Sequence, residues 1–168
     1  CMTQLNKKAS ELMLAAGDIH ACTDITGFGF FGHACEMIQG ENIGLLIDAQ
    51  ALPVIQGVRD LIESGYVPGG LYRNRNFRMS QIEKAPSCPD WIYDVCFDPQ
   101  TAGGLLFSLP AAKAKALVGR MRQAGIADAV VVVADAHELP FDDGSFDVAH
   151  AHQVLQHVAD PVRVLAEL

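Results

Sequence analysis

ACTDITGFGFFGH, the stretch from Ala21 to His33, joins a short apolar run to an acid and then to a glycine-rich helix entrance. Glycines at a helix N-terminus let backbone N–H groups approach a phosphate, and the helix dipole favours negative charge there. Asp24 precedes these glycines and would repel a bare phosphate, so the order of residues fits a divalent cation between carboxylate and phosphate. The stretch therefore predicts a metal-bridged nucleotide phosphate. The alternative is that the glycines only allow a helix to pack closely on a sheet and that Asp24 is an N-cap.

The same glycines permit a second function. Gly27, Gly29 and Gly32 match the spacing of a dinucleotide fingerprint, and Asp48 stands at the end of the next expected strand, where a ribose-binding acid belongs. This spacing keeps a nicotinamide-dependent oxidoreductase as an alternative. Against it, the fingerprint needs an apolar strand that runs straight into the first glycine, whereas polar residues intervene here.

A second motif, FDPQTAGGLL at residues 97–106, is a polar Pro/Gly loop that feeds an apolar strand. Together, TDITGFGFFGH and FDPQTAGGLL resemble the C-terminal domain of selenophosphate synthetase (selenide, water dikinase), in the aminoimidazole ribonucleotide synthetase superfamily. The resemblance covers roughly residues 2–127 and includes the connecting segments Leu5-Asn6, ALP at 51–53, VPGG at 67–70 and YRNR at 72–75. Ala102 is a departure, because the family usually has Ser there.

The resemblance implies an α+β fold, with a mixed sheet flanked by helices in three layers and a partial ferredoxin-like topology. The family reaction converts ATP, selenide and water to selenophosphate, AMP and phosphate. By resemblance, Asp24 would be a Mg²⁺ ligand, and Thr26, Gly27 and Gly29 would lie near the phosphates of ATP.

The resemblance also implies partners. The catalytic Cys or selenocysteine, its Lys and most of the ATP site belong to the family's N-terminal domain, so we assign no catalytic residue here and expect the isolated chain to be inactive. We expect it to dock on that N-terminal ATP-binding domain, in a full-length enzyme that is a homodimer. The five cysteines form no CxxC pair and are expected to be reduced thiols: Cys1, Cys22, Cys35, Cys88 and Cys96.

Composition excludes two classes of partner. The chain has 168 residues, half of them hydrophobic, and a formal net charge of −8 at pH 7. Such an acidic chain argues against nucleic-acid and membrane-surface binding, which depend on a basic field. No apolar run approaches the ~20 residues that span a bilayer. We expect a cytoplasmic protein, and the first residue, Cys1, suggests a piece of a longer one.

Periodicity predicts alternating helices and strands, and hence a sheet covered by helices. The expected helices are residues 4–16, from the glycine entrance to 38, 54–64 and 110–124, and the expected strands are 19–23, 43–49, 105–109 and 129–133. Residues 65–94 read as a long loop. Its arginines alternate with aromatics and could pair with nucleic acid, but in so acidic a chain a solvated loop or a patch facing another domain is the preferred interpretation: Arg73, Arg75 and Arg78, with Tyr72 and Phe77.

Residues 134–168 follow another pattern, ADAHELPFDDGSFDV and its continuation, which resembles the middle of a class I S-adenosylmethionine-dependent methyltransferase. In that family Asp135 and Ala136 would lie beside the adenine. The upstream glycine-rich loop and ribose-binding acid of that family have no counterpart, so S-adenosylmethionine binding is not expected. We therefore divide the chain at residue 133, as in a chimeric reading frame, with a short α/β methyltransferase-like extension. His150, His152 and His157 suggest a metal site, but no further ligand is spaced to complete it.

Overall fold

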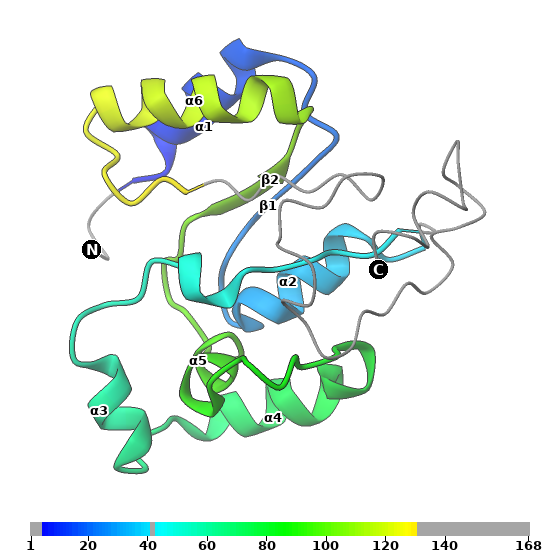
Figure 1. Cartoon of the computed structure of the whole chain (residues 1–168), viewed down its shortest axis with the longest axis vertical. Helices are drawn as coiled ribbons and strands as arrows, with labels where there is room; N and C mark the ends of the chain where they lie inside the picture. The colour runs from blue at the N-terminus through cyan, green and yellow to red at the C-terminus, as the bar shows by residue number, and fades with distance from the viewer. Residues whose placement is uncertain (1–4, 41–42, 131–168) are drawn as a thin grey trace.

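The computed structural model describes residues 5–40 and 43–130. Helices and a small antiparallel sheet make up this part of the chain (Figure 1), which confirms an α+β protein. The elements in order are α1 (Lys7–Ala16), β1 (Ala21–Asp24), α2 (Gly29–Met37), η1 (Ala49–Ala51), α3 (Val58–Glu63), α4 (Gly69–Arg78), η2 (Met79–Gln81), α5 (Asp90–Val95), β2 (Leu105–Ser108) and α6 (Ala111–Gln123).

The two strands pair with each other although 80 residues separate them in the sequence. β1 and β2 are antiparallel, with Ala21 opposite Ser108 and Asp24 opposite Leu105. In Figure 1 they run between the pair of helices α1 and α6 and a second group formed by α2, α4 and α5. The sheet therefore joins two separate clusters of buried side chains.

The first cluster lies between α1 and α6, the two helices whose sequence periodicity is clearest. Met13 of α1 packs with Leu117 and Met121 of α6, and all three are buried. Residues 117 and 121 are one helical turn apart, so they lie on one face of α6. Gly17, with φ +68°, ends α1, and Gly125, with φ +89°, follows α6, so the positions where both helices stop are as predicted.

The second cluster holds the two sequence motifs against each other. Phe31 of α2 packs with Leu71 of α4 and with Cys96 and Phe97, which follow α5, and Phe97 is fully buried. The rings of Phe31 and Phe97 meet edge to face with centroids 5.1 Å apart. Such aromatic pairs add to the free energy of burial, so this cluster fixes where the loops around it lie.

The prediction of a long loop over residues 65–94 is wrong, because this region contains α4 and α5. Its Gly and Pro residues read as turn formers, but Pro68 and Pro89 each stand immediately before a helix, where proline's fixed φ and missing N–H cost nothing. Only Leu71 of α4 is buried, so the helix has almost no apolar periodicity to detect.

The prediction of a buried strand over residues 43–49 is also wrong. Residues 43–48 have no regular structure, and Ile43, Leu45 and Leu46 are 54%, 42% and 51% exposed. An apolar run becomes a strand only where a neighbouring strand can pair with it, and β1 and β2 pair with each other.

Two further boundaries differ from the prediction. Helix α3 starts four residues late, at Val58, because Gly57 before it has a left-handed φ of +86°. Ala129 and Val130 are not in a strand, and the rest of the expected strand, 131–133, lies outside the described residues. Within residues 5–40 and 43–130, no helix is both long and apolar enough to cross a membrane.

Candidate phosphate and metal site at the two motif loops

The two sequence motifs form one continuous hydrogen-bonded unit beyond the ends of the strands. The Ile25 N–H donates to the Gly104 carbonyl at 2.9 Å, and the Gly103 N–H donates back to the Ile25 carbonyl at 2.9 Å. The Gln100 N–H then donates to the Thr26 carbonyl at 3.1 Å. The FDPQTAGG loop thus holds the backbone of the DITG segment at Ile25 and Thr26.

Gly29 allows the start of α2 to touch the end of α5. Its φ is +74°, and a Cβ added there would lie 2.8 Å from the Phe97 carbonyl carbon and 2.9 Å from the Cys96 oxygen. That oxygen accepts a hydrogen bond from the Phe31 N–H at 2.9 Å. The Gly29 N–H itself donates to the Thr26 carbonyl. These contacts support the close-packing explanation for Gly29, whose nearness to a phosphate stays a prediction.

Gly103 likewise allows a close backbone contact, here in the FDPQTAGG loop, whereas Gly27 has open space around it. A Cβ on Gly103 would lie 2.5 Å from the Ile25 oxygen and 2.6 Å from Gln100 Oε1. Gly27 is exposed, with no atom within 4 Å of an added Cβ. Within the described part of the chain, the backbone N–H groups of Thr26, Gly27 and Phe28 have no hydrogen-bond acceptor. Consecutive free N–H groups in a turn are suited to an anion.

Asp24 is the last residue of β1 and is exposed. Its backbone carbonyl accepts a hydrogen bond from Thr23 Oγ1 at 3.2 Å, while its carboxylate has no hydrogen bond or ion pair with any residue in 5–40 or 43–130. The prediction that Asp24 could be an N-cap is wrong, because α2 begins at Gly29 and its N-cap is Phe28.

A Mg²⁺ ion takes oxygen ligands, often one or two carboxylates together with substrate phosphates. The free Asp24 carboxylate fits such an ion as a single ligand. Within the described residues, no three His, Cys, Asp or Glu side chains come together to hold a metal. Asp24 therefore fits a metal site that other groups complete.

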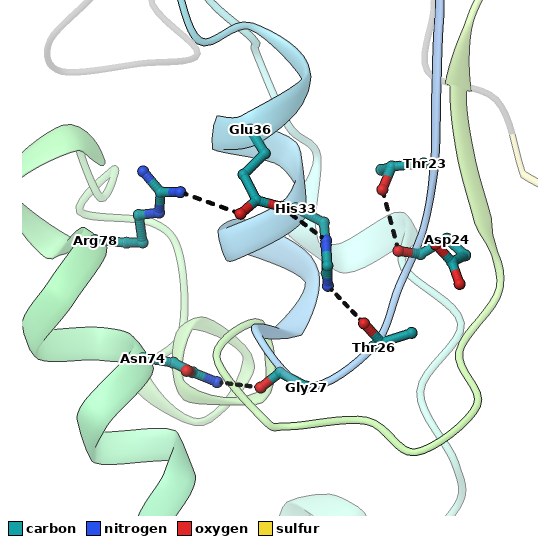
Figure 2. A network of polar contacts seen from close by, with 8 residues as sticks. All are labelled: Thr23, Asp24, Thr26, Gly27, His33, Glu36, Asn74 and Arg78. Carbon is teal, nitrogen blue, oxygen red and sulfur yellow. Dashed lines mark hydrogen bonds and ion pairs between the residues drawn. The ribbon is translucent and has the colours of Figure 1, made fainter.

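A chain of polar contacts connects α4 to the loop (Figure 2). His33 is only 7% exposed, and its Nδ1 lies 3.1 Å from Glu36 Oε2 while its Nε2 lies 3.0 Å from Thr26 Oγ1. The other carboxylate oxygen of Glu36 lies 3.7 Å from Arg78 Nη2. Sequence reasoning missed His33 and Glu36; their signal is a polar pair three residues apart in an otherwise apolar helix.

Asn74 joins α4 to both motif loops. Its side-chain amide donates to the Gly27 carbonyl at 2.9 Å and to the Phe97 carbonyl at 3.0 Å. Sequence reasoning also missed this residue, because it lies in the region predicted as a loop.

The arginines of α4 are mostly engaged within the domain. Arg75 Nη1 lies 2.9 Å from Asp94 Oδ1, and Arg78 contacts Glu36 and also donates to Gln81 Oε1 at 2.9 Å. Arg73 alone of the three has no ion pair in the part of the chain described here. A nucleic-acid patch needs several free cations, so this geometry does not favour one.

The described cysteines are poor nucleophiles. Burial raises the pKa of Cys22, Cys35 and Cys88, and it raises the pKa of Cys96 to about 12. A thiol reacts as its thiolate, which is scarce at neutral pH when the pKa is raised. The remaining predicted site residues lie outside the described residues: Cys1, Asp135, Ala136, His150, His152 and His157.

Two shallow hollows in the described surface involve other residues. One, of about 340 Å³, includes Val118 and Arg122 of α6, and another, of about 410 Å³, includes Arg59 and Trp91. The Asp24–Gly29 loop lines neither of them.

Two family models match the chain. Residues 2–138 match the model described as AIR synthase related protein, C-terminal domain. Residues 109–168 match a methyltransferase domain model, which overlaps the first. The described part of that overlap contains α6, which packs on α1.

Several curated proteins are similar to the chain. The selenide, water dikinase of Caldanaerobacter subterraneus subsp. tengcongensis is 43% identical over 122 residues, which are 73% of this chain and 35% of the relative. Selenide, water dikinase 2 of Peptoclostridium acidaminophilum is 40% identical over 131 residues, 78% of this chain and 37% of the relative. The selenide, water dikinase of Trichlorobacter lovleyi is 46% identical over 108 residues, which are 64% of this chain and 31% of the relative. The chain thus spans about a third of the length of these relatives.

Proposed function

The chain belongs to the family of AIR synthase related proteins, through their C-terminal domain, and on that premise we propose that residues 1–133 contribute one side of a Mg²⁺–ATP phosphate site to a selenide, water dikinase. The observation that carries this proposal is the exposed Asp24 carboxylate, which has no hydrogen bond or ion pair within the described residues. It precedes the free N–H groups of Thr26, Gly27 and Phe28. An acid for the metal and N–H donors for the phosphate are the two groups that such a site needs.

The chain's own residues would position the phosphates. Asp24 would hold the Mg²⁺, which when bound neutralises phosphate charge, and Thr26, Gly27 and Gly29 would line the loop beside it. Gly27 leaves open space there, and Asn74 and the FDPQTAGG loop keep its backbone in place. Ala102, exposed in that loop, brings no hydroxyl to the site.

The rest of the site would come from a partner surface. Phosphoryl transfer needs the phosphates and metals held from several sides, and Asp24 is one ligand. We infer that the family's N-terminal ATP-binding domain supplies the opposite side and the nucleophile, in a cytoplasmic homodimer. In that enzyme this domain would have a mixed sheet flanked by helices in three layers, with a partial ferredoxin-like topology. Phe28, 56% exposed beside the loop, would lie at this contact.

The test is to mix this chain with the N-terminal half of the Caldanaerobacter relative and to follow complex formation by analytical ultracentrifugation. The chain alone should form no AMP from ATP and selenide, and the mixture should sediment as a complex. A folded N-terminal half that does not bind this chain would contradict the proposed docking.

A methyltransferase remnant is the second candidate, because residues 109–168 match a methyltransferase domain model. Helix α6 lies at the described start of that match and packs on α1 in the first buried cluster. Because α6 is packed with the rest of the described domain, this does not favour an independent methyltransferase fold. If S-adenosylmethionine bound, Asp135 and Ala136 would lie beside its adenine. Calorimetric titration should show no binding, and a micromolar dissociation constant that Asp135→Ala abolishes would contradict this.

A further inference from the structure

Helix α6 concentrates positive charge in an acidic chain. It carries four basic side chains and no acidic one, whereas the whole chain has a formal net charge of −8. Lys113 is paired with Asp18, beyond the end of α1. Lys115 and Arg122 have no ion pair with any residue in 5–40 or 43–130. These two side chains therefore offer unpaired positive charge to a further partner.

Both cations line the hollow of about 340 Å³ beside α6. Positions 115 and 122 are two helical turns apart, so they lie on one face of the helix. The other lining residues in the described part of the chain are small or apolar: Ala51, Val118, Gly119 and Val130. The hollow thus presents two cations together with apolar surface, which suits a short acidic peptide segment.

The chain itself continues from this hollow. Val130, the last described residue, lines it, and Arg122 Nε donates to the carbonyl of the preceding residue, Ala129, at 3.1 Å. Residues 131–168 lie outside the described residues and contain seven acidic side chains and one arginine. A segment attached at the edge of its site has a high effective concentration there, and opposite charge favours the contact.

The spacing of the first two acids after Val130 matches the spacing of the two cations. Lys115 and Arg122 are about 10.5 Å apart along the axis of α6. Asp135 and Glu138 are three residues apart, which in a polyproline II conformation places them on the same side at about 9 Å. Five residues from Val130 can reach about 16 Å. Because Arg122 holds the backbone just before Val130, the first acid meets Arg122 and the second meets Lys115.

We propose that residues 135–138 of this chain bind the hollow beside α6, with Asp135 on Arg122 and Glu138 on Lys115. The contact attaches the start of the methyltransferase-like segment to the domain. The Asp24–Gly29 loop does not line this hollow, so the inference is independent of the proposed phosphate and metal site.

Carbodiimide cross-linking of the full chain tests the contact, because this reagent joins an amine to a carboxylate only where the two already meet. Peptide mass spectrometry should find Lys115 joined to Glu138, and the pair Lys113 and Asp18 serves as the positive control. Glu138→Gln should reduce the cross-linking of Lys115 to residues 131–168 about tenfold. Asp143→Asn, the matched control, should leave the link between positions 115 and 138 within about twofold.

A charge swap excludes an effect of either substitution alone. Lys115→Glu and Glu138→Lys should each abolish the link between positions 115 and 138, and the two substitutions together should restore it. Circular dichroism spectra that match the unchanged chain show that each variant is folded.

Three results would overturn the proposal. The first is a cross-link between Lys113 and Asp18 without one between Lys115 and Glu138. The second is a charge-swapped chain that is not cross-linked at these positions. The third is a link that forms only between chains when ¹⁵N-labelled and unlabelled protein are mixed, which would assign the hollow to a second copy.

Discussion

Gly29 and Phe97 touch backbone to backbone: a Cβ on Gly29 would lie 2.8 Å from the carbonyl carbon of Phe97. This contact joins the two sequence motifs, because Gly29 begins α2 and Phe97 starts the FDPQTAGG loop. The glycine-rich entrance therefore has a packing function at Gly29 that is separate from the open backbone at Gly27.

Gly29→Ala should destabilise the protein strongly. The left-handed φ of +74° is unfavourable for alanine, and the added methyl group overlaps backbone atoms that cannot move independently. Together these effects should lower the free energy of unfolding by about 2–5 kcal/mol, measured by urea titration followed by circular dichroism. Gly119→Ala is the matched control: it lies within α6 with open space around it, so it should be neutral or stabilising by up to about 1 kcal/mol. Equal effects of the two substitutions would contradict this packing role.

Asn74→Ala should loosen the attachment of α4 to both loops. It removes both donors and leaves the carbonyl of the fully buried Phe97 without its side-chain partner. The expected loss is about 1–3 kcal/mol in the free energy of unfolding. Asn76→Ala, on the exposed side of the same helix, should change it by less than about 0.5 kcal/mol. If the two variants unfold at the same urea concentration, Asn74 is not an anchor.

Asp98→Asn should change how stability depends on pH. Burial raises the pKa of the Asp98 carboxyl above its ordinary value, so the folded state holds the proton more tightly than the unfolded chain does. The stability from this preference is complete below the ordinary carboxyl pKa of about 4 and is lost as the pH rises through the raised pKa. The variant should therefore melt at a higher temperature than the unchanged protein at neutral pH, and the gain should vanish in acid.

Asp18→Asn is the contrasting variant for that experiment. The hydrogen bond from Lys113, and then its charge, lower the pKa of Asp18, so its contribution is present above the ordinary carboxyl pKa and is lost as the pH falls. Asp18 is exposed, so the effect should be small. The same pH trend in both variants would show that burial of Asp98 is not the cause.

Thiol labelling should follow exposure. Cys22 is exposed, whereas Cys96 is 1% exposed and burial raises its pKa to about 12. Under native conditions a maleimide should therefore label Cys22 and leave Cys96 unmodified until urea unfolds the domain, as mass spectrometry of peptides can show. Rapid labelling of Cys96 in the native protein would mean that the second buried cluster opens readily.

The sequence predicted those features that local patterns determine. Helices α1 and α6 carry clear apolar periodicity and end at glycines, and the strand beginning at Leu105 follows a Pro/Gly loop. Two motifs marked the Asp24 loop and the FDPQTAGG loop. Their contact was not predicted and is shown by the backbone hydrogen bonds between Ile25 and the Gly103–Gly104 pair.

The sequence could not predict features that depend on distant partners. Helix α4 buries only Leu71, so its periodicity gives no signal. The largely apolar run 43–48 has no strand to pair with among residues 5–40 and 43–130. The contact between Thr26 and His33 crosses from a loop to the next helix, and Asn74 reaches Gly27 from 47 residues away. The missing strand also removes the element that places Asp48 in a dinucleotide site, which weakens the oxidoreductase alternative.

The most direct test of the central claim is AMP formation from ATP and selenide in a mixture of this chain with the N-terminal half of the Caldanaerobacter selenide, water dikinase. The unchanged chain should restore AMP formation in the presence of Mg²⁺. Asp24→Asn should reduce it by about a hundredfold or more, because the variant loses the carboxylate for the metal. Asp128→Asn, another exposed acid, should leave it unchanged. Equal AMP formation with Asp24→Asn and with the unchanged chain would contradict the assignment of Asp24 to the metal site.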